Sequence, residues 1–173
     1  MVVILAGCDG TGKSTCFDKL RKSIDADFLK ESYTSDILEK KAKALFTGSK
    51  TMSDRLTIYD RATILDDLVY DPVMLNQQSQ LINVLGKKLI SVILNRCMII
   101  YFDLDNSALA ERLQYRGDDY ITSDKIKDIK NSYDKVFEDL DVNRIYLDVT
   151  NLSRDEVYNE VRRIIDSENF KNC

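Results

Sequence analysis

The fold is decided by the first fifteen residues of the chain, which read Met1-Val-Val-Ile-Leu-Ala-Gly-Cys-Asp-Gly-Thr-Gly-Lys-Ser-Thr15. Residues 1–6 form a continuous apolar run rich in β-branched side chains, which is typical of a strand buried on both faces. Residues 7–14 fit the pattern G-x-x-x-x-G-K-[ST] without a mismatch, and a helix is expected from 13 to 22. A glycine-rich turn of this kind, between a buried strand and a helix, predicts a phosphate-binding loop.

Each residue type in this loop has a physical task. Glycines allow consecutive backbone N–H groups to curl around phosphate oxygens at the positive end of the helix dipole. We expect Lys13 to reach the β- and γ-phosphates of a nucleoside triphosphate, and the Ser14 hydroxyl to coordinate Mg²⁺. The predicted phosphate-binding residues are Gly7, Gly10, Thr11, Gly12, Lys13, Ser14 and Thr15.

The rest of the chain alternates between strand and helix patterns. Further strands are predicted at 26–31, 56–60, 96–103 and 144–149, and helices at 35–50, 73–94, 107–115 and 123–140. A last helix is expected after Ser153, which forms an S-x-x-E capping box with Glu156. This alternation predicts one three-layer α/β domain over residues 1–173, built around a parallel sheet.

Composition narrows the class of ligand. Lys and Arg number 25 against 29 Asp and Glu, a net charge of −4, which favours a small soluble substrate over stable nucleic-acid binding. The absence of histidine from the sequence removes the commonest general base. The four cysteines form no CxxC pair, and no apolar run is long enough to span a bilayer. We therefore expect a reduced, cytoplasmic protein with no membrane partner.

Charged residues at the ends of two predicted strands are candidates for the acceptor side of a kinase. Asp60 and Arg61 end the strand 56–60, at the sheet edge where ligands bind in folds of this kind. A carboxylate there can organise Mg²⁺ or align an attacking oxygen, and an arginine beside it can hold a phosphate through two hydrogen bonds. Glu31 ends the strand 26–31 and is another carboxylate that can face the acceptor.

Arg112 and Arg116 are four residues apart on a predicted helix, so their guanidinium groups share one face. Two neighbouring arginines repel one another unless an anion lies between them. We therefore expect a short helical lid, about residues 112–122, that closes on the transferring phosphoryl group and excludes water. The N-K-x-D run by which GTPases recognise their base does not occur in the sequence, which favours a kinase.

Four stretches, in a fixed order, carry a family resemblance. They are GCDGTGKST at 7–15; YDR at 59–61; IYFDLD at 100–105 followed by LAER at 109–112 and Arg116; and IYLDV at 145–149 followed by RDEV at 154–157. With these stretches the chain resembles thymidylate kinases, within the wider group of nucleoside monophosphate and deoxynucleoside kinases. The first stretch is highly specific, and the others gain weight from their order and spacing. The resemblance implies a P-loop NTPase fold with a five-stranded parallel sheet, Mg²⁺, ATP as phosphoryl donor and often a homodimer.

The resemblance also implies roles for individual residues. Asp9 is expected near the acceptor sugar, and Arg61 on the acceptor phosphate. Some members of the family carry a catalytic arginine in the loop where this chain has Gly10, so the positive charge is expected from the lid. The A-Y-Q-like stretch that helps to read thymine is replaced by DDLVYD at 66–71, which leaves Tyr70 slightly out of register as an acceptor-binding candidate. The predicted catalytic residues are Lys13, Asp60, Arg61, Arg112 and Arg116, with Ser14 and Asp60 as metal ligands.

The expected activity is ATP-dependent phosphorylation of a deoxynucleoside monophosphate, dTMP or a related pyrimidine nucleotide. Three alternatives stay open. One is a deoxynucleoside kinase in which Glu31 is the base for the 5′-hydroxyl, and another is a kinase for a different small or modified-base acceptor. The third is a non-catalytic module that binds ATP as a structural or switching ligand.

Overall fold

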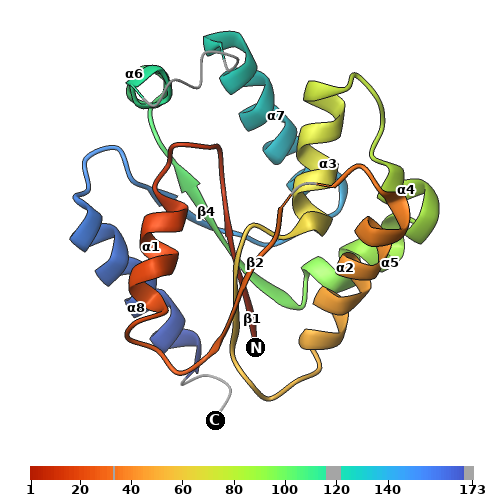
Figure 1. The fold of residues 1–173 in the computed structure, drawn as a ribbon, viewed down its shortest axis with the longest axis horizontal. Helices are drawn as coiled ribbons and strands as arrows, with labels where there is room; N and C mark the ends of the chain where they lie inside the picture. The colour runs from red at the N-terminus through yellow and green to blue at the C-terminus, as the bar shows by residue number, and fades with distance from the viewer. Residues whose placement is uncertain (33, 116–121, 170–173) are drawn as a thin grey trace.

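The computed structural model describes residues 1–32, 34–115 and 122–169. The chain alternates strands and helices around one parallel sheet (Figure 1). The strands are β1 (Val2–Ala6), β2 (Asp27–Lys30), β3 (Thr57–Asp60), β4 (Cys97–Asp103) and β5 (Ile145–Asp148). The helices are α1 (Lys13–Leu20), α2 (Ile37–Lys50), α3 (Thr63–Met74), α4 (Gln80–Leu85), α5 (Lys87–Leu94), α6 (Asn106–Tyr115), α7 (Ser123–Asp139) and α8 (Arg154–Asn169).

The sheet has five parallel strands in the order β2-β3-β1-β4-β5. Its central strand β1 pairs on one side with β3, where Val2 lies opposite Thr57, and on the other with β4, where Val2 lies opposite Cys97. Helices α1 and α8 pack together on one side of the sheet, whereas α2, α3, α4, α5 and α7 lie on the other (Figure 1). The predicted three-layer α/β fold with a five-stranded parallel sheet is therefore confirmed.

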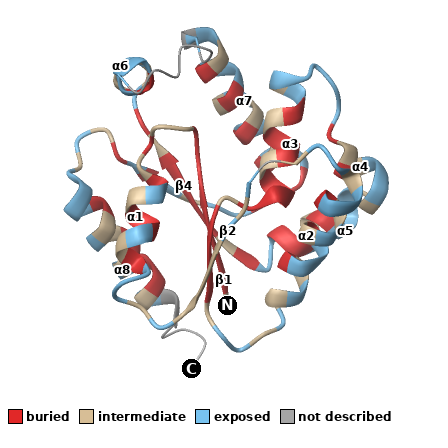
Figure 2. Cartoon of the chain, in the orientation of Figure 1, coloured by how far each residue is buried: buried red, intermediate tan, exposed pale blue. Residues whose placement is uncertain are grey.

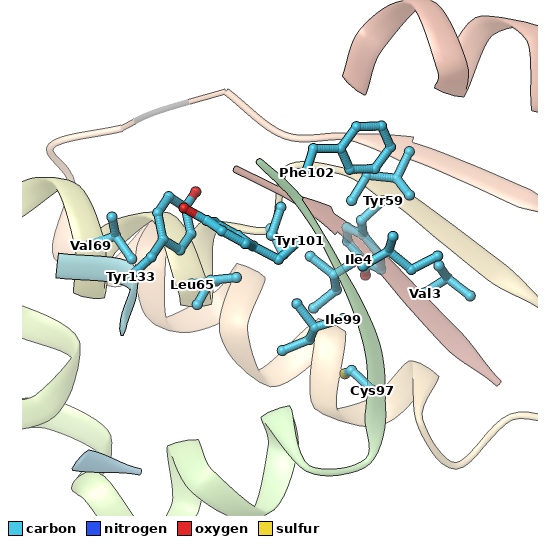
Figure 3. Packing of buried hydrophobic residues seen from close by; sticks show 14 of the residues in the cluster. Val3, Ile4, Tyr59, Leu65, Val69, Cys97, Ile99, Tyr101, Phe102 and Tyr133 are labelled. Carbon is cyan, nitrogen blue, oxygen red and sulfur yellow. The ribbon is translucent and has the colours of Figure 1, made fainter. Parts of the chain in front are cut away.

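Burial explains why the strand patterns could be recognised. Every residue of β1 and β3 is buried, because both strands are covered by helices on two faces (Figure 2). Figure 3 shows the core on one side of β4, where Ile99 and Tyr101 face Leu65 and Val69 of α3 and Tyr133 of α7. The apolar run of residues 1–6 is thus the signature of the middle of the sheet.

The prediction of one long helix from 73 to 94 is wrong. The structure has α3 from Thr63, then α4 and α5, which meet at Gly86 with a φ of 77°. Leu81, Leu85 and Leu89 are four residues apart, which predicts one face of a single helix. In the structure, however, Leu81 is fully buried whereas Leu89 is 40% exposed. A left-handed glycine turns the chain between them, so the two leucines belong to different helices.

The last helix begins as predicted. Ser153 and Glu156 form a reciprocal capping box, in which the Ser153 N–H donates to the Glu156 carboxylate at 2.8 Å and the Glu156 N–H donates to the Ser153 hydroxyl at 3.3 Å. These two bonds satisfy backbone donors that the first turn of a helix leaves unpaired. They fix where α8 starts, beside the edge of the sheet at which the phosphate-binding loop lies.

A buried cluster of charges joins three of the helices. Lys40 of α2 forms ion pairs with Asp67 and Asp71 of α3, and all three side chains are at most 2% exposed. Asp67 also accepts hydrogen bonds from the hydroxyl of Ser79 and the N–H of Leu81 at the start of α4. Burial, and then the neighbouring Asp67 carboxylate, raise the pKa of Asp71 above its ordinary value.

The contribution of the Lys40, Asp67 and Asp71 cluster to stability can be tested by substitution. Lys40→Ala should lower the free energy of unfolding by about 3–5 kcal/mol, because it leaves two buried carboxylates without their cation. Asp71→Asn should be much milder, since a neutral amide replaces a carboxylate whose ionised form is disfavoured by burial. Urea unfolding at pH 7 measures both. Lys41→Ala on the same helix is the control, and an equal loss for Lys40→Ala and Lys41→Ala would contradict the account.

Candidate nucleotide-binding site

The loop between β1 and α1 has the backbone of a tight anion-binding turn. Gly7, Gly10 and Gly12 have φ angles of 131°, 86° and 95°, in the region that side chains disfavour. At Gly7 there is also no room, because a Cβ atom there would lie 2.4 Å from the backbone oxygen of Phe102 on β4. The close pairing of β1 with β4 therefore requires glycine at the point where the chain leaves the sheet.

Lys13, the first residue of α1, places its ammonium group inside the curve of this loop. Its Nζ donates to the carbonyl oxygens of Gly7 and Cys8, both at 2.6 Å, and to the Thr11 hydroxyl at 3.3 Å. The side chain is only 5% exposed. The Tyr133 hydroxyl of α7 also donates to the Gly7 carbonyl, at 3.3 Å. The loop thus holds a cation at its centre, where a phosphate group would be attracted to it.

A cavity of about 930 Å³ opens beside the loop, which suits a ligand of nucleotide size. Its wall contains Asp9, Arg61 and Arg112 together with the loop residues 10–15, so residues predicted for the donor and acceptor sides meet in one cavity. Four of the predicted site residues in the described part of the chain do not line the cavity, namely Gly7, Glu31, Asp60 and Tyr70. The other lining residues are Cys16, Glu111, Tyr115, Val149, Leu152, Arg154 and Val157.

Arg61 lies at the centre of the acceptor-side candidates. Its backbone has a φ of 66°, which is uncommon for a residue with a side chain and costs free energy. The guanidinium group forms ion pairs with Asp9 of the loop and, at 3.5 Å, with Asp66 of α3. It also lies 5.7 Å from the ring centre of Tyr70. The arginine is therefore held between two carboxylates and an aromatic ring in the wall of the cavity.

Asp60 and Glu31 hold the chain on either side of Arg61. The Asp60 side chain is 1% exposed and forms an ion pair with Lys30 of β2 at 3.1 Å. Glu31 accepts a hydrogen bond of 2.6 Å from the backbone N–H of Thr63, the first residue of α3. Both carboxylates thus lie at the carboxyl edge of the sheet, as predicted, while Glu31 contacts backbone.

Tyr70 faces the core more than the cavity. Its ring packs edge-on against Tyr133 of α7, with 6.4 Å between ring centres. Burial, and then the nearby Asp66 carboxylate, raise the pKa of its hydroxyl. Its contact with the Arg61 guanidinium makes it a support for the acceptor side, and its role in reading a base stays a prediction.

Two further arginines, from different elements, line the cavity. Arg112 on α6 donates to the Gly10 carbonyl at 3.5 Å, so the helix predicted to carry the lid does lie over the loop. Arg154, at the start of α8, is a lining residue that sequence reasoning missed. The capping box indicates where its helix begins, but not that this end borders the same cavity as the loop. Arg116 and most of the predicted lid lie outside the described residues.

Asp66 is a second residue that sequence reasoning missed. Burial raises the pKa of its carboxyl to about 6, while Arg61 and Lys13 act in the opposite direction and Glu31 and Asp60 reinforce the rise. Asp66 does not line the cavity, but it is paired with Arg61, which does, and a strongly shifted acid beside such a residue is characteristic of functional sites. In the sequence, Asp66 is marked only by its position five residues after Arg61. That position indicates a place near Arg61 only when α3 is known to begin at Thr63.

Comparisons with known proteins agree on the fold. No family model matches the chain. The curated YorR, an uncharacterized protein derived from the SPbeta prophage of Bacillus subtilis (strain 168), is 24% identical over 164 residues, covering 92% of this chain and 96% of YorR. The crystal structure of YorR in complex with phosphorylated GDP matches with a TM-score of 0.77, over 98% of both chains.

Two kinases that differ from one another in their acceptor are also similar to this chain in structure. Deoxyadenosine kinase from M. mycoides matches at 16% identity with a TM-score of 0.66, over 96% of this chain and 100% of the other. Thymidylate kinase from Candida albicans matches at 16% identity with a TM-score of 0.59, over 97% and 92%. The chain has the fold of P-loop kinases.

None of the helices in the described part of the chain has both the length and the apolar composition of a membrane-spanning helix.

The raised pKa of Asp66 predicts a pH-dependent gain in stability for Asp66→Asn. The folded-state pKa of about 6 lies above the ordinary 3.8, so ionisation of this group opposes folding. That penalty is fully present above pH 6 and disappears as the pH falls below 3.8. At pH 8 the variant should gain about 1–3 kcal/mol in the free energy of unfolding.

Urea unfolding between pH 4 and pH 8 tests this expectation. The gain should shrink steadily toward pH 4, and Asp18→Asn, at an exposed position on α1, should show no such trend. A loss of stability at pH 8 would show that the Asp66 carboxylate stabilises the fold through Arg61 by more than its burial opposes it.

Proposed function

We propose that this protein transfers the γ-phosphate of ATP to a deoxynucleoside monophosphate, with dTMP or a related pyrimidine nucleotide as the acceptor. The observation that carries the proposal is the position of Arg61. Its guanidinium borders the same cavity as the phosphate-binding loop and lies beside Asp9 of that loop. A guanidinium at this place suits an acceptor that carries a phosphate, because it can hold a dianion through two charge-assisted hydrogen bonds.

The donor side would bind and orient ATP. The N–H groups of the loop and the Lys13 ammonium would hold the β- and γ-phosphates, and Arg112 would add charge from α6. The lid residue Arg116 is proposed to join it. Phosphoryl transfer asks little covalent chemistry of a protein, so these groups act by positioning the phosphates and neutralising their charge. Arg154, which also lines the cavity, is suited to the same anion.

Magnesium fits the residues at this edge of the sheet. One carboxylate oxygen of buried Asp60 has no hydrogen-bond partner within the described part of the chain, and the other is ion-paired with Lys30 at 3.1 Å. Ser14 is exposed at the cavity. Mg²⁺ prefers such oxygen ligands and is commonly held by one or two protein groups together with substrate phosphates. When bound, it would neutralise charge on the phosphate oxygens.

The identity of the acceptor base rests on resemblance, and one relative points elsewhere. The YorR structure contains phosphorylated GDP, so guanine nucleotides belong among the acceptors to be tested.

The second candidate function is that of a deoxynucleoside kinase. It is favoured by the similarity to deoxyadenosine kinase and by the carboxylates of Glu31 and Asp66 near Arg61. A non-catalytic ATP-binding module is the rival from another class.

Lys13→Ala tests the phosphoryl transfer itself. Removal of one preorganised charge from the transferring group should lower kcat by about 100-fold or more. The circular dichroism spectrum and the urea midpoint should stay close to those of the wild type, and Lys22→Ala, at an exposed position, serves as the control. Turnover near that of the wild type in a folded Lys13→Ala protein would exclude the proposed kinase mechanism.

Arg61→Ala tests the assignment of the acceptor. If Arg61 holds a substrate phosphate, the variant should raise the KM for a monophosphate acceptor about 30-fold or more, since a charge-assisted pair in a partly buried site is lost. The KM for ATP should change little. Arg55→Ala, which removes a surface arginine paired with Asp25 and Asp27, is the matched control. A steep rise in the KM for ATP with no change for the acceptor would move Arg61 to the donor side.

A further inference from the structure

Helix α3 begins without a cap from its own first residues. Ala62 stands at the position before the helix, and its methyl group offers no acceptor to the first backbone N–H groups. The hydroxyl of Thr63 is buried and makes no hydrogen bond within the described residues. Helix starts normally have Ser, Thr, Asp or Asn at this position, because an uncapped first turn leaves donors unsatisfied.

The missing cap comes from another strand. The carboxylate of Glu31, one residue beyond the end of β2, accepts the backbone N–H of Thr63 at 2.6 Å. In the parallel pairing of β2 with β3, Lys30 lies opposite Asp60, so Glu31 comes level with Arg61. The negative charge of Glu31 lies at the positive end of α3, where the helix dipole favours an anion.

The last residue of β2 and the residue that follows it therefore anchor the chain on both sides of Arg61. Lys30 forms an ion pair with Asp60, the residue before Arg61, at 3.1 Å. Glu31 binds the N–H of Thr63, two residues after it. Between these anchors the backbone of Arg61 adopts its left-handed φ of 66°. A residue with a side chain stays in that region only where its surroundings hold it there.

We propose that Glu31 is a positioning residue for Arg61. By capping α3 it fixes the turn between β3 and α3, and this turn directs the guanidinium to Asp9 and the cavity. The role requires an oxygen that accepts a hydrogen bond, and no proton is moved. It differs from the role of a general base, which requires a titratable carboxylate at the same place. The inference rests on the proposed function in one respect, namely that Arg61 holds the acceptor.

Glu31→Gln and Glu31→Ala separate the two roles. The amide oxygen of glutamine can still accept the Thr63 N–H, so Glu31→Gln should keep kcat and the acceptor KM within about threefold of the wild type. Glu31→Ala removes the cap, so Arg61 should lose its alignment and the acceptor KM should rise about tenfold or more. The KM for ATP should change little. The pH profile of kcat should be unchanged in Glu31→Gln. Glu39→Ala, at an exposed position on α2, is the control.

A readout that needs no turnover keeps this test independent of the proposed activity. Amide hydrogen exchange at Thr63 should become at least about tenfold faster in Glu31→Ala and stay close to that of the wild type in Glu31→Gln. If no acceptor is turned over but exchange follows this pattern, the proposed function fails while the capping role stands. A collapse of kcat in Glu31→Gln with normal exchange at Thr63 would overturn the proposal and make Glu31 the base. Unchanged exchange in Glu31→Ala would overturn it as well.

Discussion

The close approach of β1 to β4 is the constraint on which the rest of the site depends. The backbone oxygen of Phe102 lies where a side chain at position 7 would begin, so the strand can leave the sheet only through glycine. The loop that follows curls around the Lys13 ammonium, which donates to the carbonyls of Gly7 and Cys8. The geometry of the phosphate-binding loop is thus set by the pairing of two buried strands, and the loop in turn forms part of the cavity wall.

The position of Arg61 depends on a second set of contacts across strands. Arg61 is strained in its backbone and held in its side chain by Asp9 and Asp66. Its neighbours along the chain are in turn held by Lys30, at the end of β2, and by Glu31, which follows it. Functional sites commonly retain such strain and such shifted carboxylates, because they prepare a charged group in advance for its ligand. Here a guanidinium faces the cavity already oriented.

The parts of the fold that could be predicted are those with a local physical cause. Strands such as Val2–Ala6 are buried on both faces and therefore appear as unbroken apolar runs. Helix α3 could not be recognised in the same way, because its buried face includes Asp67 and Asp71, whose partner Lys40 is distant in sequence. The division between α4 and α5 depends on the left-handed φ of Gly86, which the leucine spacing concealed.

The same distinction applies to the candidate site. The loop residues and the Asp60-Arg61 pair could be predicted because short motifs specify them. Asp66 and Arg154 could not, since their positions at the site follow from where α3 and α8 begin relative to the sheet. Glu31 was identified as a candidate, but only its hydrogen bond to Thr63 suggested a role in positioning. Motifs predict contacts within a segment, whereas contacts between segments require the structure.

Transfer of the γ-phosphate of ATP to a phosphate-bearing acceptor can be measured as ADP release by the wild-type protein with Mg²⁺ and ATP, across dTMP, dCMP, dGMP, dAMP and the corresponding nucleosides. We expect at least one monophosphate to yield ADP and an equal amount of its diphosphate, while its nucleoside yields neither. Efficient turnover of nucleosides with none of the monophosphates, or tight ATP binding without any ADP release, would exclude a monophosphate kinase.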